Sequence, residues 1–192
     1  MRDLAILTFQ TLDGVMQAPM TPDEDRTGGF DQGGWAAPYF EQVMAQVGRE
    51  AMAKPYDMLF GRKTYDMFAG HWPNVESDPA ADRMNAARKY VVSGGSPNLS
   101  WNNSHLVSGD VPAELAALKR QDGPLLQVHG SAQLIQTLMA HDLINEFRLW
   151  TFPVIVGSGK RLFESGAAPG EFQLKKSEQG QNGVVMTLYA RS

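Results

Sequence analysis

The chain has 192 residues, of which 43% are hydrophobic, enough for one domain with a sizeable core. Its net charge of −4 and the lack of a long basic run argue against nucleic-acid binding, and the absence of cysteine excludes disulfides and cysteine-based metal or nucleophile chemistry. Since no apolar run could span a bilayer and the start lacks a signal-peptide pattern, we expect one cytoplasmic domain over residues 1–192 that does not bind membranes.

The first quarter of the chain predicts a strand, a long loop and a helix. Residues 4–9 form an apolar, β-rich run that is typical of a central strand, and the Asp13-Gly14 pair predicts a turn after it. Residues 17–34 are polar and rich in Gly and Pro, which fits either a solvated surface loop or a lid over an active site. A helix is expected over 38–52. Its buried face should carry Phe40, Val43, Met44 and Val47.

The middle of the chain alternates short strands with helices. We expect, in chain order, a strand over 56–60, a helix opening at 61–65, a helix over 82–87, strands over 89–93 and 104–107, and a helix over 112–120. This alternation is typical of an α/β fold with a mostly parallel sheet.

The strongest local pattern is a strand–turn–helix–strand unit within residues 124–164. It comprises a strand over 125–128, a helix over 132–141 and a strand over 145–156. Two alternating segments, 172–177 and 184–190, flank an Asn-Gly pair and predict an antiparallel hairpin at the end of the chain. The fold class is therefore α/β, with one mixed, mostly parallel sheet and an antiparallel carboxyl-terminal hairpin.

Three glycine-containing turns follow predicted strands and could bind phosphate. Gly130 permits close approach of a ligand to the backbone, while Ser131 could cap the following helix, whose start favours anions. The second turn reads Gly61, Arg62, Lys63 and Thr64; it fits either a phosphate site or an ordinary glycine helix entry with surface cations. The third turn contains Ser93 and Gly94. Parallel strands would bring the three turns to one sheet edge.

Other common site motifs are missing. No glycine-rich dinucleotide fingerprint follows a strand, no P-loop is present, and the four histidines lack metal-ligand spacing, so no metal site is expected. Asp13 could offer a carboxylate at the end of the first strand or only begin a turn, and His129 could face a pocket or pack against the sheet. Glu41 and Trp35 are further candidates, although an acid is common in a first helical turn and a tryptophan is common in a core.

Four segments together resemble a known family. They are Leu12-Asp13-Gly14, Gly61-Arg62-Lys63-Thr64-Tyr65, Tyr90-Val91-Val92-Ser93, and the block from Val128 to Phe163. In this order they resemble the dihydrofolate-reductase-like superfamily, and most closely the C-terminal reductase domain of bacterial riboflavin biosynthesis (RibD), here as a stand-alone chain. The resemblance implies a single three-layer dihydrofolate-reductase-like domain with helices on both faces of the sheet.

The resemblance further implies an NADPH-dependent reductase of a small heterocyclic or carbonyl substrate, related to 5-amino-6-(5-phosphoribosylamino)uracil reductase. The cofactor-binding residues would be Gly14, Gly61, Arg62, Lys63, Thr64, Ser93, Gly94, Gly130, Ser131 and Ala132. Asp13 is the first candidate for the proton-donating or polarising group, with Glu41 and His129 behind it. Asp13 and Trp35 would also contact substrate.

One turn departs from the family pattern. Riboflavin-pathway reductases usually carry Glu-Gly-Gly where this chain carries His129-Gly130-Ser131. An imidazole in place of a carboxylate changes both charge and hydrogen-bonding pattern, so the substrate is left open. The alternative function is a non-catalytic or regulatory protein that binds NADP(H) on the same fold. Either form could be a homodimer that uses its carboxyl-terminal strands as the interface.

Overall fold

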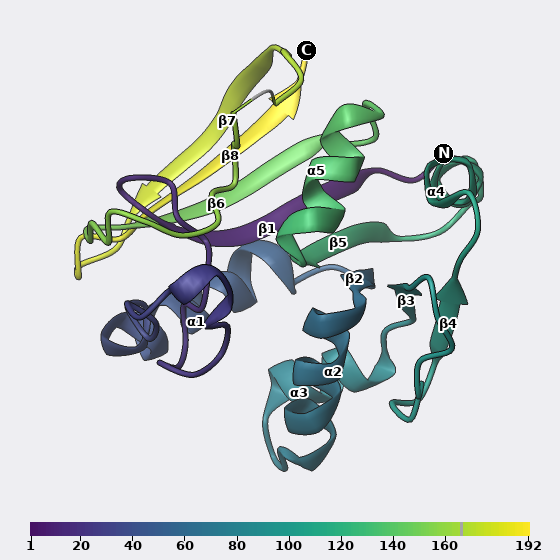
Figure 1. The fold of residues 1–192 in the computed structure, drawn as a ribbon, viewed down its shortest axis with the longest axis horizontal. Helices are drawn as coiled ribbons and strands as arrows, with labels where there is room; N and C mark the ends of the chain where they lie inside the picture. The colour runs from purple at the N-terminus through teal and green to yellow at the C-terminus, as the bar shows by residue number, and fades with distance from the viewer. Residues whose placement is uncertain (166) are drawn as a thin grey trace.

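The computed structural model describes residues 1–165 and 167–192, and its centre is one eight-stranded sheet (Figure 1). The strands lie in the order β4-β3-β2-β5-β1-β6-β8-β7. They are β1 (Leu4–Thr11), β2 (Tyr56–Gly61), β3 (Lys89–Val92), β4 (Ser104–Val107), β5 (Leu125–Gly130), β6 (Glu146–Phe152), β7 (Phe172–Gln179) and β8 (Val185–Arg191). β1 to β6 are parallel, and β7 and β8 form the predicted antiparallel hairpin.

Helices cover both faces of this sheet and create two hydrophobic cores. The helices are α1 (Phe40–Ala51), α2 (Arg62–His71), α3 (Pro79–Ala86), α4 (Val111–Arg120) and α5 (Ala132–Ala140), with short 3-10 helices η1 (Thr27–Gly29), η2 (Ala37–Tyr39) and η3 (Trp72–Asn74). Residues of α1, α2 and α3 pack in one core, and residues of α4 and α5 pack in the other. The three-layer α/β fold expected from the sequence is therefore confirmed. Within the described ranges, no helix has the length and apolar character needed to cross a membrane.

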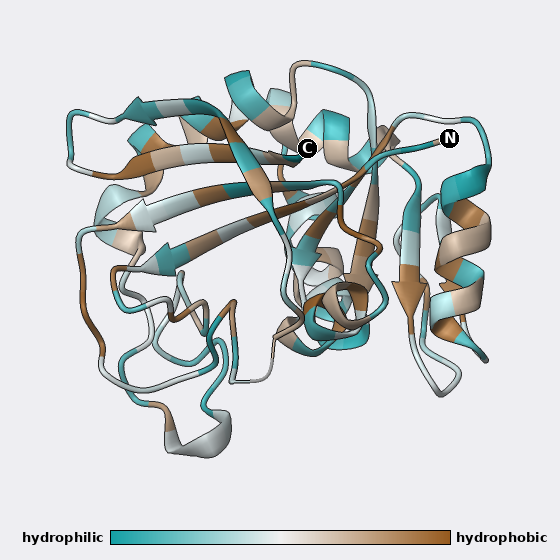
Figure 2. Cartoon of the chain, turned by 90° about the horizontal axis from the view of Figure 1, so that it is seen from above, coloured by the Kyte–Doolittle hydropathy of each residue, from teal (hydrophilic) through white to brown (hydrophobic). Residues whose placement is uncertain are grey.

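β1 holds the two cores together at the middle of the sheet. Its side chains alternate between the faces, so that Leu4 and Ile6 enter the α4–α5 core while Leu7 enters the opposite one. Figure 2 shows hydrophobic residues along these central strands and hydrophilic residues in many of the connecting loops. β5 and β6 are not neighbours in the strand–helix–strand unit: β1 lies between them and pairs with both. No local pattern in residues 124–164 indicated that insertion.

Several element boundaries differ from the sequence-based expectation; for example, the helix expected over 82–87 is α3, which begins three residues earlier. The strand predicted over 145–156 ends at Phe152, because Pro153 has no N–H to donate to a neighbouring strand. The helix predicted over 38–52 begins as the 3-10 helix η2 and becomes α-helical at Phe40. Phe40, which we expected in the core, is 39% exposed. Tyr39 instead packs toward the sheet, with its ring centroid 5.5 Å from that of Phe152.

The long segment between β1 and α1 is anchored by Gln17, which is almost fully buried. Its side-chain amide donates to the carbonyl oxygens of Asp25 and Thr27 at 3.0 and 2.9 Å, and its Oε1 accepts from the Lys160 N–H at 2.9 Å. The backbone carbonyl of Gln17 also accepts from the Trp35 indole at 2.9 Å. These hydrogen bonds argue against the interpretation of residues 17–34 as a freely solvated loop.

Candidate functional site

The two central strands send the chain to opposite faces of the sheet. β1 leads to α1, which belongs to one core, whereas β5 leads to α5, which belongs to the other. Figure 1 shows α1 and α5 on opposite sides of this strand pair. Since β1 and β5 are parallel neighbours, the region beyond their carboxyl ends is a topological switch point. Ligands of open α/β sheets bind at such points.

Two of the predicted glycine turns touch each other at this edge. A Cβ atom on Gly61 would overlap the hydroxyl oxygen of Ser131 and lie 3.0 Å from its Cβ. A Cβ atom on Gly130 would lie 2.9 Å from the hydroxyl oxygen of Thr64. Gly130 also has a φ of +143°, a conformation that glycine adopts most readily, and the following peptide bond is cis. The ends of β2 and β5 and the starts of α2 and α5 therefore form one continuous surface.

The helices that start at this surface lack side-chain caps. Asp78 and Asp110 cap α3 and α4 by accepting hydrogen bonds from their first-turn N–H groups. Gly61 and Ser131 occupy the corresponding positions of α2 and α5, and neither makes a side-chain cap hydrogen bond. The expectation that Ser131 caps its helix is therefore wrong. The uncapped N–H groups of both helices remain available to an anion, which the helix dipole also favours.

Cationic and hydroxyl side chains flank the same surface. Arg62 is about half exposed and pairs with Asp66, with 2.6 Å between Nε and Oδ2. Lys63 is exposed and forms no ion pair within the described part of the chain. Directly after β3, Ser93 is buried and accepts a hydrogen bond from the Gly95 N–H at 3.2 Å. Pairing of β2 with β3 puts Ser93 and the exposed Gly94 at this sheet edge.

The side chain of Asp13 links the turn after β1 to the segment after β6 through hydrogen bonds. Its carboxylate accepts hydrogen bonds from the hydroxyl of Thr11 at 2.6 Å and from the N–H groups of Val156 and Gly157 at 3.3 and 2.9 Å. Arg161 donates to the Asp13 carbonyl oxygen at 2.9 Å, and the two side chains approach to 3.7 Å. The hydrogen bond from Thr11, helped by the two backbone donors, lowers the pKa of Asp13. The group is therefore an anion at neutral pH. Gly14 follows with a φ of +78°.

His129 lies at the carboxyl end of β5, beside two phenylalanine rings. Its ring centroid is 6.1 Å from that of Phe60 and 5.7 Å from that of Phe68. Its Nε2 atom is buried and has no hydrogen-bond partner among residues 1–165 and 167–192. Burial lowers the pKa of His129 to about 4, because a charged imidazolium would lose hydration in this setting. The imidazole is therefore neutral at physiological pH.

Among the described residues, the other two candidates make no hydrogen bond or ion pair with the glycine turns. Glu41 is exposed on the first turn of α1, and no hydrogen bond or ion pair of its side chain occurs among the described residues. Trp35 is only 7% exposed, and its ring meets that of Phe152 edge to face at 5.2 Å between centroids. Trp35 thus stabilises the core through packing and through its hydrogen bond to Gln17.

Partly exposed aromatic residues near His129 escaped the sequence analysis. Phe68 follows Thr64 by one helical turn and so lies on the same side of α2. Phe9 and Tyr39 meet Phe152 on the same face of the sheet, at 5.3 and 5.5 Å between centroids. The spacing of Thr64 and Phe68 was a usable signal, but Phe9 and Tyr39 are brought together only by the tertiary fold.

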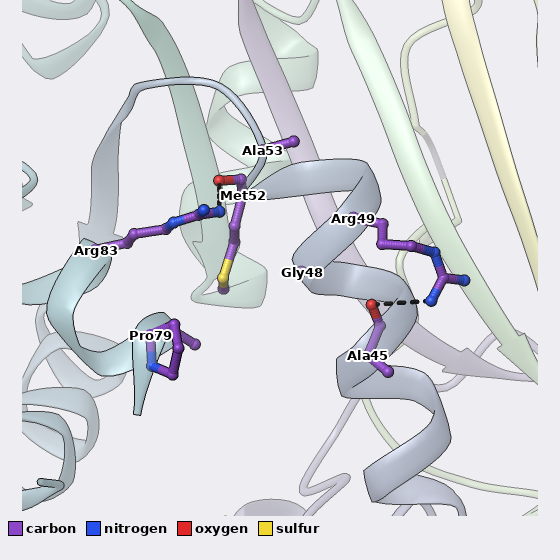
Figure 3. Close-up of a pocket in the computed structure, with 8 residues that line it drawn as sticks. Ala45, Gly48, Arg49, Met52, Ala53, Pro79 and Arg83 are labelled. Carbon is purple, nitrogen blue, oxygen red and sulfur yellow. Dashed lines mark hydrogen bonds between the residues drawn. The ribbon is translucent and has the colours of Figure 1, made fainter. Parts of the chain in front are cut away.

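Two hollows in the described surface lie outside the glycine turns. One, of about 410 Å³, separates the outer side of α1 from α3 (Figure 3). It is lined by Ala45, Gly48, Arg49, Met52, Ala53, Pro79, Ala80 and Arg83. The other, of about 510 Å³, lies between the segment after β1 and the Ser158–Lys160 turn. In residues 1–165 and 167–192, no group of three or more His, Cys, Asp or Glu side chains could hold a metal ion. The glycine turns carry the convergent chemistry, so we assign the candidate site to them.

Comparisons with known proteins show the family of this chain. The model of the RibD C-terminal domain family matches residues 3–186. Two uncharacterized proteins of Bacillus subtilis (strain 168) are similar in sequence. YwjB is 32% identical over 138 residues, which cover 70% of this chain and 73% of YwjB. YyaP is 29% identical over 137 residues, which cover 69% of this chain and 72% of YyaP.

Solved structures share the fold at low sequence identity. A putative riboflavin biosynthesis protein from Shewanella sp. PV-4 is 21% identical, with a TM-score of 0.63 and coverage of 100% of this chain and 99% of its own. Dihydrofolate reductase from Enterococcus faecalis has a TM-score of 0.61 at 12% identity, and the match covers 99% of this chain and 96% of the reductase. A pyrimidine reductase-like protein from Corynebacterium diphtheriae has a TM-score of 0.67 at 10% identity, and the match covers 98% of this chain and 91% of that protein.

Proposed function

The chain belongs to the RibD C-terminal domain family, and we propose that it is an NADPH-dependent reductase of a small heterocyclic or carbonyl substrate. The family and the reductases that share its fold support a reductase-type enzyme. The structure of the Enterococcus faecalis dihydrofolate reductase is a complex with NADP(H). For the present chain, the family supports NADPH as the cofactor, and the glycine turns supply residues that suit it.

The observation that carries the proposal is the contact between Gly61 and Ser131. It brings two uncapped helix starts to one surface, where backbone N–H groups favour anionic oxygens. The pyrophosphate of NADPH would lie against Gly130, Ser131 and Ala132 at the start of α5. The contact between Gly61 and Ser131 leaves no room for larger side chains there. A ligand at this surface would therefore meet backbone groups rather than bulky side chains.

The cations at the start of α2 favour NADPH over NADH. Arg62 and Lys63, with Thr64 and Ser93, would bind the adenosine side of the cofactor, including its 2′-phosphate. An exposed lysine without an ion-pair partner is available for such an anion, and arginine recognises phosphate through several parallel donors. The exposed Gly94 leaves the backbone accessible beside Ser93, and Gly14 would lie near the nicotinamide.

When bound, NADPH supplies a hydride, and the reduced substrate must also take up one proton. Asp13 is an anion held by three hydrogen bonds, so its role is to position the turn that carries Gly14. His129 is neutral and has a free ring nitrogen, which suits a hydrogen bond to substrate better than acid catalysis. Water would then provide the proton. Glu41 remains the other acidic candidate on the same side of the sheet.

One observation favours a second function, a non-catalytic protein that binds NADP(H). Neither Asp13 nor His129 holds an acidic proton at neutral pH, because the pKa of each lies below that range. A fold that retains the cofactor surface without a protein proton donor could act as a sensor of NADP(H). The two functions share the cofactor and differ in turnover.

Turnover with a chemically broad panel distinguishes the two functions. NADPH oxidation is followed by the loss of its absorbance in the presence of aminouracils, dihydropterins and quinones, one class at a time. A reductase oxidises NADPH with at least one class, and the rate scales with protein concentration. NADPH binding without oxidation by any class favours the non-catalytic function.

We also propose that the protein forms a homodimer through β7. This strand ends the sheet, most of its side chains are exposed, and Leu174 among them is 53% exposed. An edge strand presents unpaired backbone groups that a second copy could pair with. Sedimentation at micromolar concentration should give the mass of two chains, and a monomer would contradict this assembly.

A further inference from the structure

A completely buried lysine joins the end of α3 to the irregular segment after β3. Lys89 is the first residue of β3, and its ammonium donates a hydrogen bond of 2.7 Å to the carbonyl of Asn85 in the last turn of α3. Carbonyl groups at the end of a helix attract cations. The same ammonium lies 4.3 Å from the ring centroid of Trp101, which is a cation–π contact. The indole N–H of Trp101 in turn donates to Oδ1 of Asn85 at 2.7 Å.

The charge of Lys89 is not balanced by an acidic side chain. Among residues 1–165 and 167–192, Lys89 forms no ion pair. Burial lowers the pKa of Lys89 to about 8, and no neighbouring charge contributes to that change. The side chain is therefore still mostly protonated at neutral pH. Because an unpaired buried charge is unfavourable for folding, packing alone does not account for a lysine at this position.

The ionisable groups on the elements around Lys89 are engaged elsewhere or exposed. Residues 94–103 contain no ionisable side chain. On the neighbouring strands and on α3 these groups are Asp57, which pairs with Arg2, Arg83, which donates to the Met52 carbonyl, and the exposed Asp82, Arg88 and His105. From α2, the hydroxyl of Tyr65 contacts the backbone of Trp101.

Trp101 also connects this lysine to the start of α2. Trp101 is 3% exposed, and its backbone N–H donates to the hydroxyl oxygen of Tyr65 at 3.1 Å. Its ring lies 6.2 Å from that of Phe60, between centroids. Tyr65 directly follows Thr64, and Phe60 directly precedes Gly61. Trp101 therefore packs against the residues that flank the second glycine turn.

The segment that Trp101 ends begins at the third glycine turn, with Ser93 and Gly94. Residues 94–100 have no regular secondary structure, and Gly94 is exposed. β3 holds one end of the segment, and Trp101 holds the other. Loss of the attraction between Lys89 and Trp101 would loosen the second end and leave the strand in place.

We infer that Lys89 is a positioning residue for the adenosine side of the cofactor site, whose ammonium holds Trp101 and with it the Ser93–Gly94 turn against the start of α2. The inference rests on the proposed function, in which Ser93 and the start of α2 bind the adenosine and the 2′-phosphate of NADPH. Lys89 is buried and acts through Trp101, without touching the cofactor. A neutral amine can keep the hydrogen bond to α3 but loses the cation–π contact, so cofactor affinity depends on the charge of Lys89.

The adenosine half of the cofactor tests this role. Adenosine 2′,5′-bisphosphate carries the 2′-phosphate and the 5′-phosphate, and calorimetry measures its dissociation constant. Lys89→Met removes the charge and keeps an unbranched side chain, so binding should weaken about three- to tenfold, within the range of one cation–π contact. The matched control is Lys119→Met, because Lys119 is a partly buried lysine of α4, whose residues pack in the other core, and it bonds two oxygen atoms there. The control should bind like the wild type, and equal effects of the two substitutions would overturn the inference.

The pH dependence of the same binding separates a positioning role of the charge from a purely structural role. Above about pH 7 both phosphates of the ligand are ionised, since the second pKa of such a group is about 6. Wild-type affinity should fall as the pH rises through 8, where Lys89 loses its proton. The affinity of Lys89→Met should stay constant over the same range. Parallel profiles of the two proteins would overturn the inference.

Tryptophan variants and the wild-type profile decide the question if Lys89→Met fails to fold. Trp101→Phe keeps a ring but weakens the cation–π contact and removes the hydrogen bond to Asn85, so it should weaken binding of adenosine 2′,5′-bisphosphate. Trp35→Phe removes a comparable buried indole hydrogen bond, to the carbonyl of Gln17, and should not. Unchanged binding by Trp101→Phe, or a wild-type affinity that does not fall through pH 8, would overturn the inference.

NADPH binding to the same samples separates this inference from the proposed function. If the wild type binds neither NADPH nor adenosine 2′,5′-bisphosphate, the proposed cofactor and this inference are both refuted. If the wild type binds both and Lys89→Met binds them equally well, this inference alone is refuted and the cofactor assignment stands.

Discussion

Gly61 lies so close to Ser131 that a single methyl group on Gly61 would overlap the serine hydroxyl. Gly61 has a φ of −74°, so alanine is compatible with its backbone and only the contact opposes it. Gly61→Ala should lower the free energy of unfolding by about 1–3 kcal/mol, the usual cost of overpacking. It should also weaken NADPH binding, because the starts of α2 and α5 are forced apart. Chemical denaturation and cofactor titration measure the two effects.

Gly70→Ala is the matched control on the same helix. A Cβ atom at Gly70 would meet nothing within 4 Å. Alanine is favoured over glycine inside a helix by up to about 1 kcal/mol, so Gly70→Ala should stabilise the protein and leave NADPH binding unchanged. Equal effects of Gly61→Ala and Gly70→Ala would show that the contact with Ser131 is unimportant.

A buried ion pair fixes the amino-terminal end of β1 to β2. The guanidinium of Arg2 contacts the carboxylate of Asp57, both side chains are almost fully buried, and Arg2 Nε donates to the Pro124 carbonyl at 2.9 Å. Arg2→Ala leaves a buried carboxylate unpaired and should cost about 3–5 kcal/mol in thermal or denaturant unfolding. Arg26→Ala breaks an exposed pair with Asp23 and should cost at most about 1 kcal/mol. Similar costs for both would contradict the account.

His129 should make the protein less stable in acid. Its pKa is about 4 when folded and 6.5 in the unfolded chain, so between these values the unfolded state binds a proton that the folded state does not. Stability is therefore unaffected above pH 6.5 and falls as the pH drops toward 4, by about 3 kcal/mol in total from this residue. His129→Phe should remove that loss. Denaturation of both proteins across this range gives the difference, and parallel curves would refute the prediction.

Asp13 should contribute more to stability than to proton transfer. Asp13→Asn replaces one of two accepting oxygens by an amide nitrogen, so at least one of the bonds from Thr11, Val156 and Gly157 is lost. Hydrogen bonds to a charged group contribute about 1.5–3 kcal/mol each, and the free energy of unfolding should fall by about that amount. Unchanged stability would refute the anchoring role.

The sequence predicted the individual strands of the sheet well, because short-range patterns determine each of them. The apolar run of residues 4–9 and the Asn-Gly pair at 182–183 each determine an element through short-range patterning. The glycine turns were also predicted to converge, since parallel strands end at the same edge, and the contact of Gly61 with Ser131 agrees with that expectation.

The parts that escaped prediction depend on tertiary packing. Insertion of β1 between β5 and β6 is set by long-range pairing, which the 124–164 segment does not encode locally. Trp35 was a candidate for substrate binding, because a tryptophan can line a binding site or pack in a hydrophobic core. The sequence does not distinguish these two roles, whereas the contact of Trp35 with Phe152 places it in the core. The free Nε2 of His129 likewise depends on neighbours from β2 and α2.

In the function proposed here, the α2–α5 surface binds NADPH through its 2′-phosphate and pyrophosphate. The most direct test measures the dissociation constants of NADPH and NADH for the wild type, for Lys63→Ala, and for the control Lys54→Ala at an exposed lysine after α1. We predict tighter binding of NADPH than of NADH, and a loss of about ten- to one-hundredfold for NADPH alone in Lys63→Ala, as expected for a hydrogen bond between charged groups. Equal loss of both cofactors, or no NADPH binding by the wild type, would contradict the account.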